Sequence, residues 1–360
     1  MTRLTRRAEE ALLGAALFRP EILPAMQWVP PGAFSRPDHG ALWRTLHAID
    51  FSQVPRAEIP AVVTRAVERI EDRGIRNCLS PQRLQQLAGA CPNPRTAALY
   101  GGMTVEGGVH RAVEDTGDRL RAAAQQADVE QAGDTVGQAQ VARERFASLH
   151  QAWLSTPEQV RVLLDTQHDQ RLPEPEAQQA RRPERLDLQA EFDVVASLQW
   201  DSRQVGDIPW LQDQDFADPA LRTAYGAITA LHERQSPVDD LTVAWEAARR
   251  GGPQPSEQLL ADLARHGSGG IAAHAGARVL STAALDRLET AGGQVRDAGR
   301  SPALAPSALV VRAEQSLQPS LTDERRIHHA EREPELADGK EPSPPAHPAH
   351  EVPALSEMEM

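Results

Sequence analysis

The sequence predicts an all-α protein made of two tandem small helical bundles, each with a protruding helical hairpin, joined by a flexible linker. No stretch keeps the two-residue period of a half-buried strand, whereas apolar residues recur at three- and four-residue spacing in many segments. The chain also repeats itself. Moved by 182 positions without a gap, residues 190–228 align with residues 8–46.

The evidence for the repeat comes more from positions that keep an apolar residue than from positions with identical residues. Five of the 39 aligned positions are identical: Ala8/Ala190, Glu9/Glu191, Trp28/Trp210, Phe34/Phe216 and Pro37/Pro219. Protein cores tolerate exchanges between apolar residues of similar volume. Such exchanges occur at Leu12/Val194, Leu13/Val195, Phe18/Trp200, Leu23/Val205, Met26/Ile208, Val29/Leu211, Trp43/Tyr225 and Leu46/Ile228. We therefore predict two copies of one helical domain.

The first copy is expected to span residues 1–154. Thr5 is a suitable N-cap for a first helix that ends before Pro20, with Leu12, Leu13, Ala16 and Leu17 on its buried face. Further helices are predicted at 22–26, 38–49, 59–70, 81–90 and 94–100, followed by a loop at 101–108. A long helical arm at 109–154, broken near the glycines of 133–137, predicts a hairpin.

The second copy is expected to span residues 186–318, after a flexible linker at 155–185 that is rich in Pro, Glu and Gln. Its best-delimited helix begins at Asp239 or Asp240 as N-cap and ends at Gly251. Leu241, Ala244, Ala247 and Ala248 are predicted to line its buried face. A helix at 258–265, a loop at 267–270, an arm at 272–294 and a short helix after Pro306 follow. The acidic, proline-rich tail at 319–360 is predicted to be disordered.

The composition argues against several classes of function. A formal net charge of −13 makes direct nucleic-acid binding weak, because phosphate contacts require a basic surface. The clusters Arg3, Arg6, Arg7 and Arg181, Arg182, Arg185 are better explained as solvated helix ends and linker. No 18-residue apolar run predicts a membrane span, and no apolar signal core follows the N-terminus. Cys78 and Cys91 fit a reduced, cytoplasmic protein.

Two segments carry a resemblance to a known family. The segment AEEALLGAALFRPEIL, followed by FSRPDHGALWRTL, is similar to the N-terminal domain of DnaB-type replicative helicases, through Ala8, Glu9, Ala11, Leu12, Leu13, Gly14, Leu17, Phe34 and His39. The segment SPVDDLTVAWEAARRGG resembles a later part of the same domain through Pro237, Val238, Asp239, Thr242 and Val243. The first copy lacks the Pro-Asp-Thr segment, and the second has Leu221 where the first has His39.

The resemblance implies a helical bundle whose hairpin self-associates, forms a collar on the hexameric helicase and contacts primase. We therefore expect a non-enzymatic DNA-replication accessory or assembly protein that binds helicase or primase or competes with them. A helical scaffold or regulator of a phage or mobile element, without a replication partner, is the alternative. Each arm must bury its apolar stripe, and the resembled hairpin does so against another copy of itself. We therefore expect the two arms to pair within one chain, and a homodimer in which arms pair between chains is the alternative.

No catalytic, cofactor-binding or metal-binding residue is predicted, and the partner-binding residues are unknown. A helicase motor needs the loop G-x-x-x-x-G-K-[ST], and the single lysine, Lys340, stands outside any such loop. Other candidates have simpler explanations. His328 and His329, with Asp323 and Glu324, are expected to be solvated; His39 is expected to start a helix; the His266-Gly-Ser-Gly-Gly run is expected to be a turn; Trp28 and Trp210 are expected to pack in or beside the core.

Overall fold

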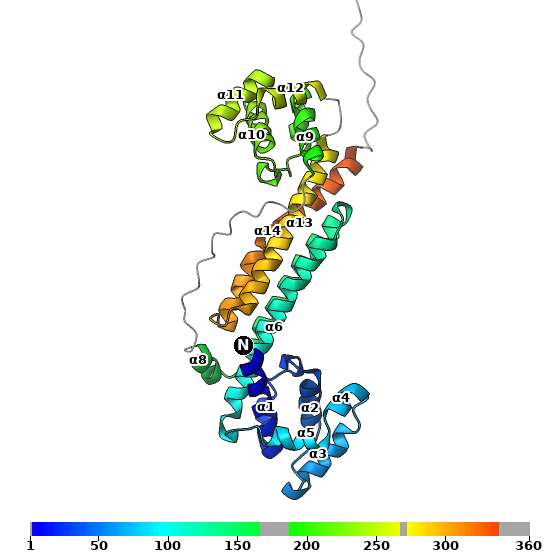
Figure 1. Cartoon of the computed structure of the whole chain (residues 1–360), viewed down its shortest axis with the longest axis vertical. Coiled ribbons are helices and arrows are strands. Elements are labelled where there is room, and N and C mark those ends of the chain that lie inside the picture. Colours follow the sequence, from blue (N-terminus) through cyan, green and yellow to red (C-terminus); the bar gives the residue numbers. More distant parts are fainter. Residues whose placement is uncertain (1, 166–186, 267–271, 338–360) are drawn as a thin grey trace, which may run out of the picture.

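The computed structural model describes residues 2–165, 187–266 and 272–337. Every regular element within these ranges is helical, so the all-α prediction is confirmed. Four long helices form a central stem, and short helices form two groups at its opposite ends, which we call the first head and the second head (Figure 1). None of the helices in the described ranges has the length and apolar character needed to cross a membrane.

The first head consists of short helices that surround α1. Its elements are α1 (Thr2–Phe18), η1 (Pro20–Met26), η2 (Pro31–Ala33), α2 (Pro37–His47), η3 (Arg56–Glu58), α3 (Ile59–Val67), α4 (Arg73–Cys78), α5 (Pro81–Ala88), η4 (Pro94–Thr96) and α8 (Glu158–Asp165). The predicted buried face of α1 is largely right, because Leu12, Leu13 and Ala16 are buried. Thr5 is not the N-cap, since the helix begins at Thr2 and Thr5 lies buried inside it.

The second head contains α9 (Leu188–Trp200), η6 (Ser202–Asp207), η7 (Asp213–Asp215), α10 (Pro219–Glu233), α11 (Asp240–Arg250) and α12 (Glu257–His266). The predicted ends of α11 are confirmed: Asp239 caps it in a capping box with Thr242, and Gly251 ends it at φ 72°. The predicted buried face is wrong in part. Val243 and Ala247 are buried, whereas Leu241 is exposed.

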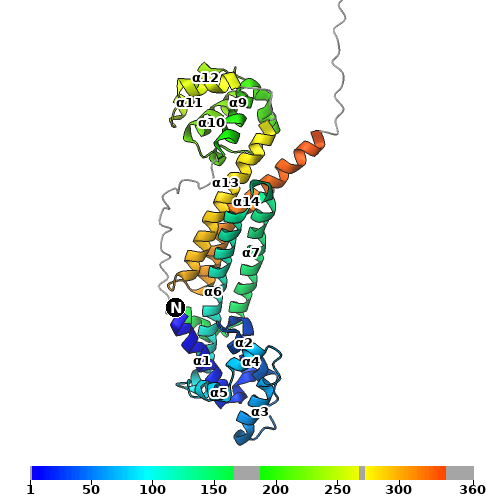
Figure 2. The same ribbon diagram turned by 45° about the vertical axis from the view of Figure 1, so that its right-hand side comes forward.

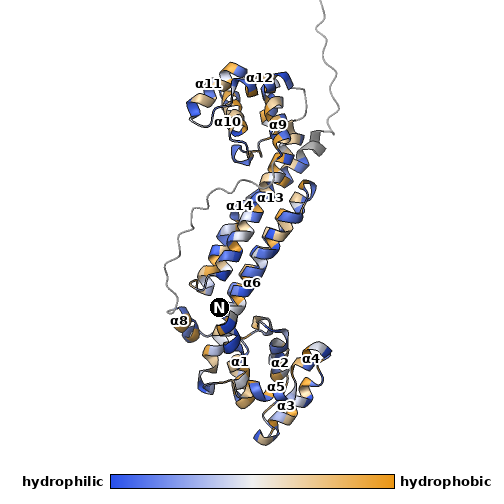
Figure 3. Cartoon of the chain, in the orientation of Figure 1, coloured by the Kyte–Doolittle hydropathy of each residue, from blue (hydrophilic) through white to orange (hydrophobic). Residues whose placement is uncertain are grey.

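The stem is formed by two helical hairpins. The first consists of α6 (Ala97–Gln126), the turn η5 (Val129–Gln131) and α7 (Ala132–Leu154). The second consists of α13 (Ala272–Arg300) and α14 (Pro306–Ala337). Helix α13 packs along α6, and α14 packs along both α13 and α7, so the arms pair within one chain as predicted (Figures 1 and 2). Hydrophilic and hydrophobic residues both occur along the stem helices α6, α13 and α14 (Figure 3).

Two predictions about the first arm are wrong. Residues 101–108 are not a loop but part of α6. The glycines of this segment have a packing role, since they allow the first head to approach the helix closely. A Cβ at Gly101 would lie 2.6 Å from Met26 Cε, and one at Gly108 would lie 2.9 Å from Ala33 Cα. The hairpin turns at 127–131, and the glycines of 133–137 lie inside α7.

Two predictions of disorder are also wrong within the described residues. Helix α8 lies inside the expected linker and buries Val160 and Leu164 against the first head. Helix α14 continues to Ala337 and buries Leu321 and Ile327, although the tail was expected to begin at 319. Local composition was misleading in both places because burial there depends on distant partners. Residues 166–186, 267–271 and 338–360, with their predicted linker, loop and tail, lie outside the described residues.

Candidate functional site: two head–stem joints and the paired hairpins

The two heads hold corresponding aromatic side chains in the same way. In the first head, Trp43 Nε1 donates a hydrogen bond of 2.9 Å to the carbonyl oxygen of Val29. In the second head, 182 positions later, Tyr225 Oη donates to Leu211 O at 2.9 Å. Burial raises the pKa of Tyr225 to about 12. Each of these side chains also packs against a phenylalanine at a corresponding position. The ring centroids of Phe34 and Trp43 are 5.7 Å apart, and those of Phe216 and Tyr225 are 4.7 Å apart.

A buried glutamate also occupies the same place in each head. Glu9 accepts hydrogen bonds from Ser35 N at 2.7 Å and from Ser35 Oγ at 2.8 Å. Glu191 accepts from Ala217 N at 2.7 Å and from Asp218 N at 3.0 Å. Each carboxylate therefore satisfies the backbone that leads into the next helix, α2 or α10.

The surroundings of these two glutamates differ. Glu9 lies 3.2 Å from His39 Nδ1 and 3.5 Å from Arg111 Nη2. In the second head the position of His39 is taken by Leu221. Burial raises the pKa of Glu191, and the hydrogen bonds from the two backbone N–H groups oppose this only in part. The same carboxylate is thus held by two basic side chains in one head and largely by backbone N–H groups in the other.

The first-head cluster links four helices, because Glu9, His39, Arg83 and Arg111 come from α1, α2, α5 and α6. Arg83 Nη2 lies 3.4 Å from His39 Nε2, and a guanidinium can only donate, so Nε2 accepts and Nδ1–H faces Glu9. The Ser35 hydroxyl donates to Glu9 and not to His39, so these three side chains are not arranged as a serine–histidine–carboxylate relay. His39 therefore has the helix-start hydrogen-bonding role that the sequence predicts.

The number of positions that separates corresponding residues of the two halves changes once along the chain. Residues 68–80 link α3 to α5 and include α4, whereas only residues 251–256 link α11 to α12. The corresponding positions are consequently 175 apart in the stem, where α6 begins at Ala97 and α13 at Ala272. A Cβ at Gly101 would touch Trp28, and one at Gly276 would touch Trp210. Both tryptophans thus pack against a stem glycine, as the core-or-edge prediction required.

The contacts between α6 and α13 are reciprocal under this 175-residue offset. A Cβ at Gly117 would lie 2.3 Å from Arg296 N and 2.6 Å from Gly292 O. A Cβ at Gly292 would lie 2.7 Å from Arg121 N and 2.9 Å from Gly117 O. The two helix backbones therefore come closest where both helices have glycine, and only glycine fits there without moving a backbone.

Two polar contacts, one on either side of this crossing, are also related by the 175-residue offset. Gln125 Nε2 donates to Glu289 Oε1 at 2.6 Å, and Arg300 Nε donates to Glu114 Oε1 at 2.7 Å. Gln125 corresponds to Arg300, and Glu114 corresponds to Glu289. Such exchange of equivalent contacts is characteristic of a two-fold, isologous interface, here formed inside one chain.

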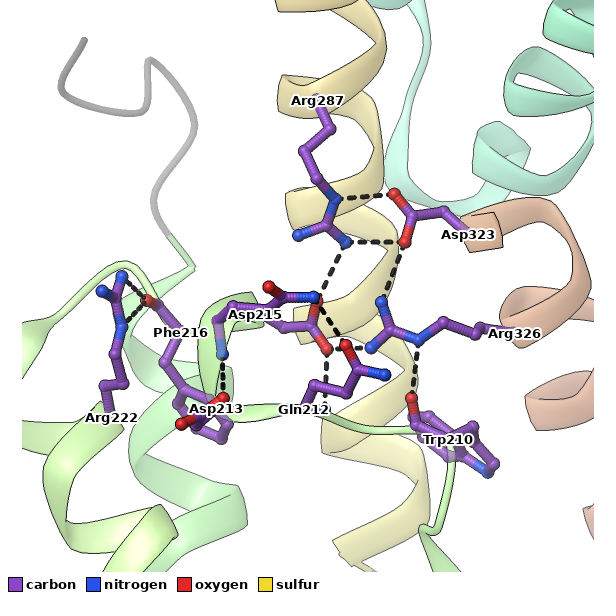
Figure 4. A network of polar contacts seen from close by, with 10 residues as sticks. Trp210, Gln212, Asp213, Asp215, Phe216, Arg222, Arg287, Asp323 and Arg326 are labelled. Carbon is purple, nitrogen blue, oxygen red and sulfur yellow. Dashed lines mark hydrogen bonds and ion pairs between the residues drawn. The ribbon is translucent and has the colours of Figure 1, made fainter. Parts of the chain in front are cut away.

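The second head is joined to the stem by a buried ionic network (Figure 4). Arg326 on α14 donates to Trp210 O at 2.8 Å and to Asp323 Oδ1 at 2.8 Å, and it also pairs with Asp215. Arg287 on α13 donates to Asp323 Oδ2 at 2.6 Å and to Asp215 Oδ1 at 2.9 Å. Burial alone would lower the pKa of Arg287, but its bonds and charge interactions with Asp323 and Asp215 raise it above the ordinary value.

The sequence did not predict this network, because Asp323 and Arg326 fall in the segment expected to be disordered. The spacing of residues along α14 shows which of them share a helix face, but it does not identify partners more than 100 positions away in the sequence. The i, i+3 spacing of Asp323 and Arg326, which is compatible with an intrahelical ion pair, was the one available hint.

The other candidate residues do not assemble a chemical site. His328 is exposed and lies 3.4 Å from Glu331, and no group of metal-ligating side chains occurs within the described residues. Cys78 and Cys91 are unpaired thiols. His266 ends α12, while Lys340, Arg181, Arg182 and Arg185 lie outside the described residues.

These features define a class first: an all-α protein whose two hairpins pair in a two-fold manner and carry a small helical head at each end. Residues 184–280 match the family model described as the DnaB-like helicase N terminal domain. The match covers the second head and the beginning of α13. No curated protein and no solved structure matched the chain.

Proposed function

We propose that this chain is a non-enzymatic accessory or assembly protein of DNA replication that binds a replicative helicase or a primase, or competes with one of them. The match of residues 184–280 to a helicase N-terminal domain supports a connection with replication. The single observation that carries the proposal is the reciprocal crossing of α6 and α13, since it gives one chain the two-fold pairing that the resembled domain makes between chains.

The proposal includes a two-copy origin for the chain. Residues 8–46 and 190–228 share a sequence pattern, and the corresponding pairs Trp43/Tyr225 and Glu9/Glu191 make corresponding hydrogen bonds. The ion pair Arg19–Glu21 recurs with its charges exchanged as Asp201–Arg203. Unrelated segments would have no reason to keep the pairing while inverting its sign.

Pairing inside the chain leaves the heads as the surfaces for a partner. The faces of α6 and α13 are already buried against each other, so a second chain is not needed to cover them. Exposed aromatic residues occur at corresponding places in the two heads: Phe18 is 67% exposed and Trp200 is 66% exposed. Large exposed aromatic side chains are common anchors of protein interfaces.

The proposed role needs no nucleotide hydrolysis. These 360 residues contain no loop that combines glycines with a lysine to hold nucleotide phosphates. We expect purified protein to show no ATP turnover above background, with or without single-stranded DNA. Turnover that rises with single-stranded DNA and persists after repurification would contradict this part of the proposal.

The decisive experiment is a binding measurement with the full chain. Immobilised protein is incubated with lysate of the producing organism, and retained helicase and primase are quantified by mass spectrometry. We then expect the double variant Phe18→Ser/Trp200→Ser to retain at least tenfold less of them. Val141→Ser is the matched control, since Val141 is 66% exposed but lies on stem helix α7.

Two outcomes count against the proposal. If neither helicase nor primase is enriched over an unrelated acidic bait, the alternative of a scaffold without a replication partner is favoured. If both are enriched but the head variant and the stem control bind equally, the heads are not the partner surface.

A further inference from the structure

A buried histidine joins the first hairpin to the turn of the second. His110 on α6 is 4% exposed. Its Nδ1 lies 2.9 Å from the carbonyl oxygen of Gly299 near the end of α13, and its Nε2 lies 3.1 Å from the carbonyl oxygen of Leu304 in the turn that leads to α14. One imidazole ring thus bridges two points of the α13–α14 turn.

The protonation state of this ring decides whether both contacts are favourable. A carbonyl oxygen only accepts hydrogen bonds, and a neutral imidazole has one N–H donor and one acceptor nitrogen. The neutral ring therefore satisfies one carbonyl and turns a lone pair towards the other. The imidazolium donates to both. The carbonyls at the end of α13 also carry the negative end of the helix dipole, which favours a cation.

The other half of the stem has no such group. The position that corresponds to His110 on α13 is Leu285, which is fully buried and cannot titrate. The turn of the first hairpin is consequently held without a histidine at this position. A change in the charge of the His110 ring therefore acts directly on the turn of the second hairpin.

Other charged groups lie on the helices that pack at this end of the stem. On α6 they are Glu106, one turn before His110, and Glu114, one turn after it; on α13 they are Arg296, Asp297 and Arg300; on α7 and α14, His150 and Glu314 line a shared groove. Arg300 is bonded to Glu114, and Arg296 to Asp297.

We propose that His110 is a pH-sensitive clasp that holds the turn of the second hairpin against the first hairpin when its ring is protonated and loosens it when the ring is neutral. This inference rests on the geometry of the stem and does not depend on a role in replication. It assigns a regulatory device to the side of the stem that faces the first head.

The sign of the effect follows from proton linkage. Burial disfavours the charged ring, which water solvates in the unfolded chain; in the proposed clasp the two carbonyl acceptors and the negative end of the α13 dipole outweigh this, so that the folded chain holds the proton more tightly. The stabilisation is fully present below about pH 6.5, the value of an unperturbed histidine, and is lost as the pH rises above it. One proton changes the unfolding equilibrium constant by at most about tenfold per pH unit.

The first test is urea unfolding of the full chain between pH 5.5 and 8.5. We expect the midpoint of the wild type to fall as the pH rises, and this fall to be lost in His110→Gln and in His110→Leu, which copies the opposite position. His150→Gln is the matched control and should keep the wild-type dependence. An equal pH dependence in the wild type and both His110 variants would overturn the proposal.

A second measurement decides the matter even if the variants do not fold. The wild-type chain is labelled with ¹⁵N-histidine, and the ring nitrogens are followed by NMR during a pH titration. We expect one buried ring to show two protonated nitrogens at pH 6.5 and to lose one proton at higher pH. Every buried ring carrying a single proton already at pH 6 would refute the clasp.

Discussion

The two heads are alike inside and differ in how they are attached to the stem. The first head has a core of its own, which α8 and Trp153 complete, whereas the core of the second head is continuous with that of the stem. The second attachment contains the buried network of Asp215, Arg287, Asp323 and Arg326. Contacts inside a head, and the packing of Trp28 and Trp210 against stem glycines, recur at corresponding positions, whereas the polar contacts that join head to stem do not.

The largest expected effect comes from breaking the second attachment. Arg326→Met removes a cation from two buried carboxylates and should lower the free energy of unfolding by about 3–5 kcal/mol. Arg83→Met in the first head should cost at most about 1 kcal/mol, because Arg83 and Glu10 are partly exposed. Urea unfolding of the full chain measures both. Similar costs for the two substitutions would show that the buried network adds no more stability than an ion pair inside the first head.

A cavity in the first core should separate the two regions. Leu13 is fully buried, and Leu13→Ala should cost about 2–5 kcal/mol. Because this core is separate from that of the stem, the first head should then unfold at lower urea than the rest, which gives two transitions. Leu4→Ala on the same helix is the control, since Leu4 is 65% exposed. A single transition with an unchanged midpoint would mean that Leu13 is not part of such a core.

The smallest expected difference concerns the two buried glutamates. Glu9→Gln should cost about 1.5–3 kcal/mol, since it weakens charge-assisted bonds to His39 and Arg111. Glu191→Gln should cost less at neutral pH. The raised pKa of Glu191 means that the folded chain binds its proton more tightly, so stability falls as the pH rises above about 4.3, and the amide removes this fall.

Unfolding midpoints at pH 4.5 and pH 7 test this comparison. We expect the midpoint at pH 7, taken relative to the midpoint at pH 4.5, to be higher in Glu191→Gln than in the wild type. An unchanged difference would show that the ionisation of Glu191 is not linked to folding.

Local chemistry explains what the sequence predicted well. The ends of α11 follow from Asp239, Thr242 and Gly251, which act within a few residues of one another. The pairing of the hairpins followed from a physical requirement, because a long amphipathic arm must bury its apolar stripe. Neither prediction needed knowledge of a distant partner.

The errors share the opposite cause. The glycines of 101–108 were interpreted as a loop, although they lie in a helix that the first head approaches closely. The acidic composition of the second half of α14 predicts disorder, although Arg326 binds Asp215 of the second head and Asp323 binds Arg287 of α13. Exposure of Leu241 also depends on how α11 sits on α10 and α12 and not on its own periodicity.

The covalent link between the hairpins changes how their interface can evolve. In a dimer of identical chains, every substitution appears on both sides of the two-fold axis, so a buried histidine would be introduced twice. In this chain, a mutation at position 110 leaves position 285 untouched. One side can therefore acquire a titratable group while the other stays aliphatic, and an inherited symmetric contact can become directional without losing its partner.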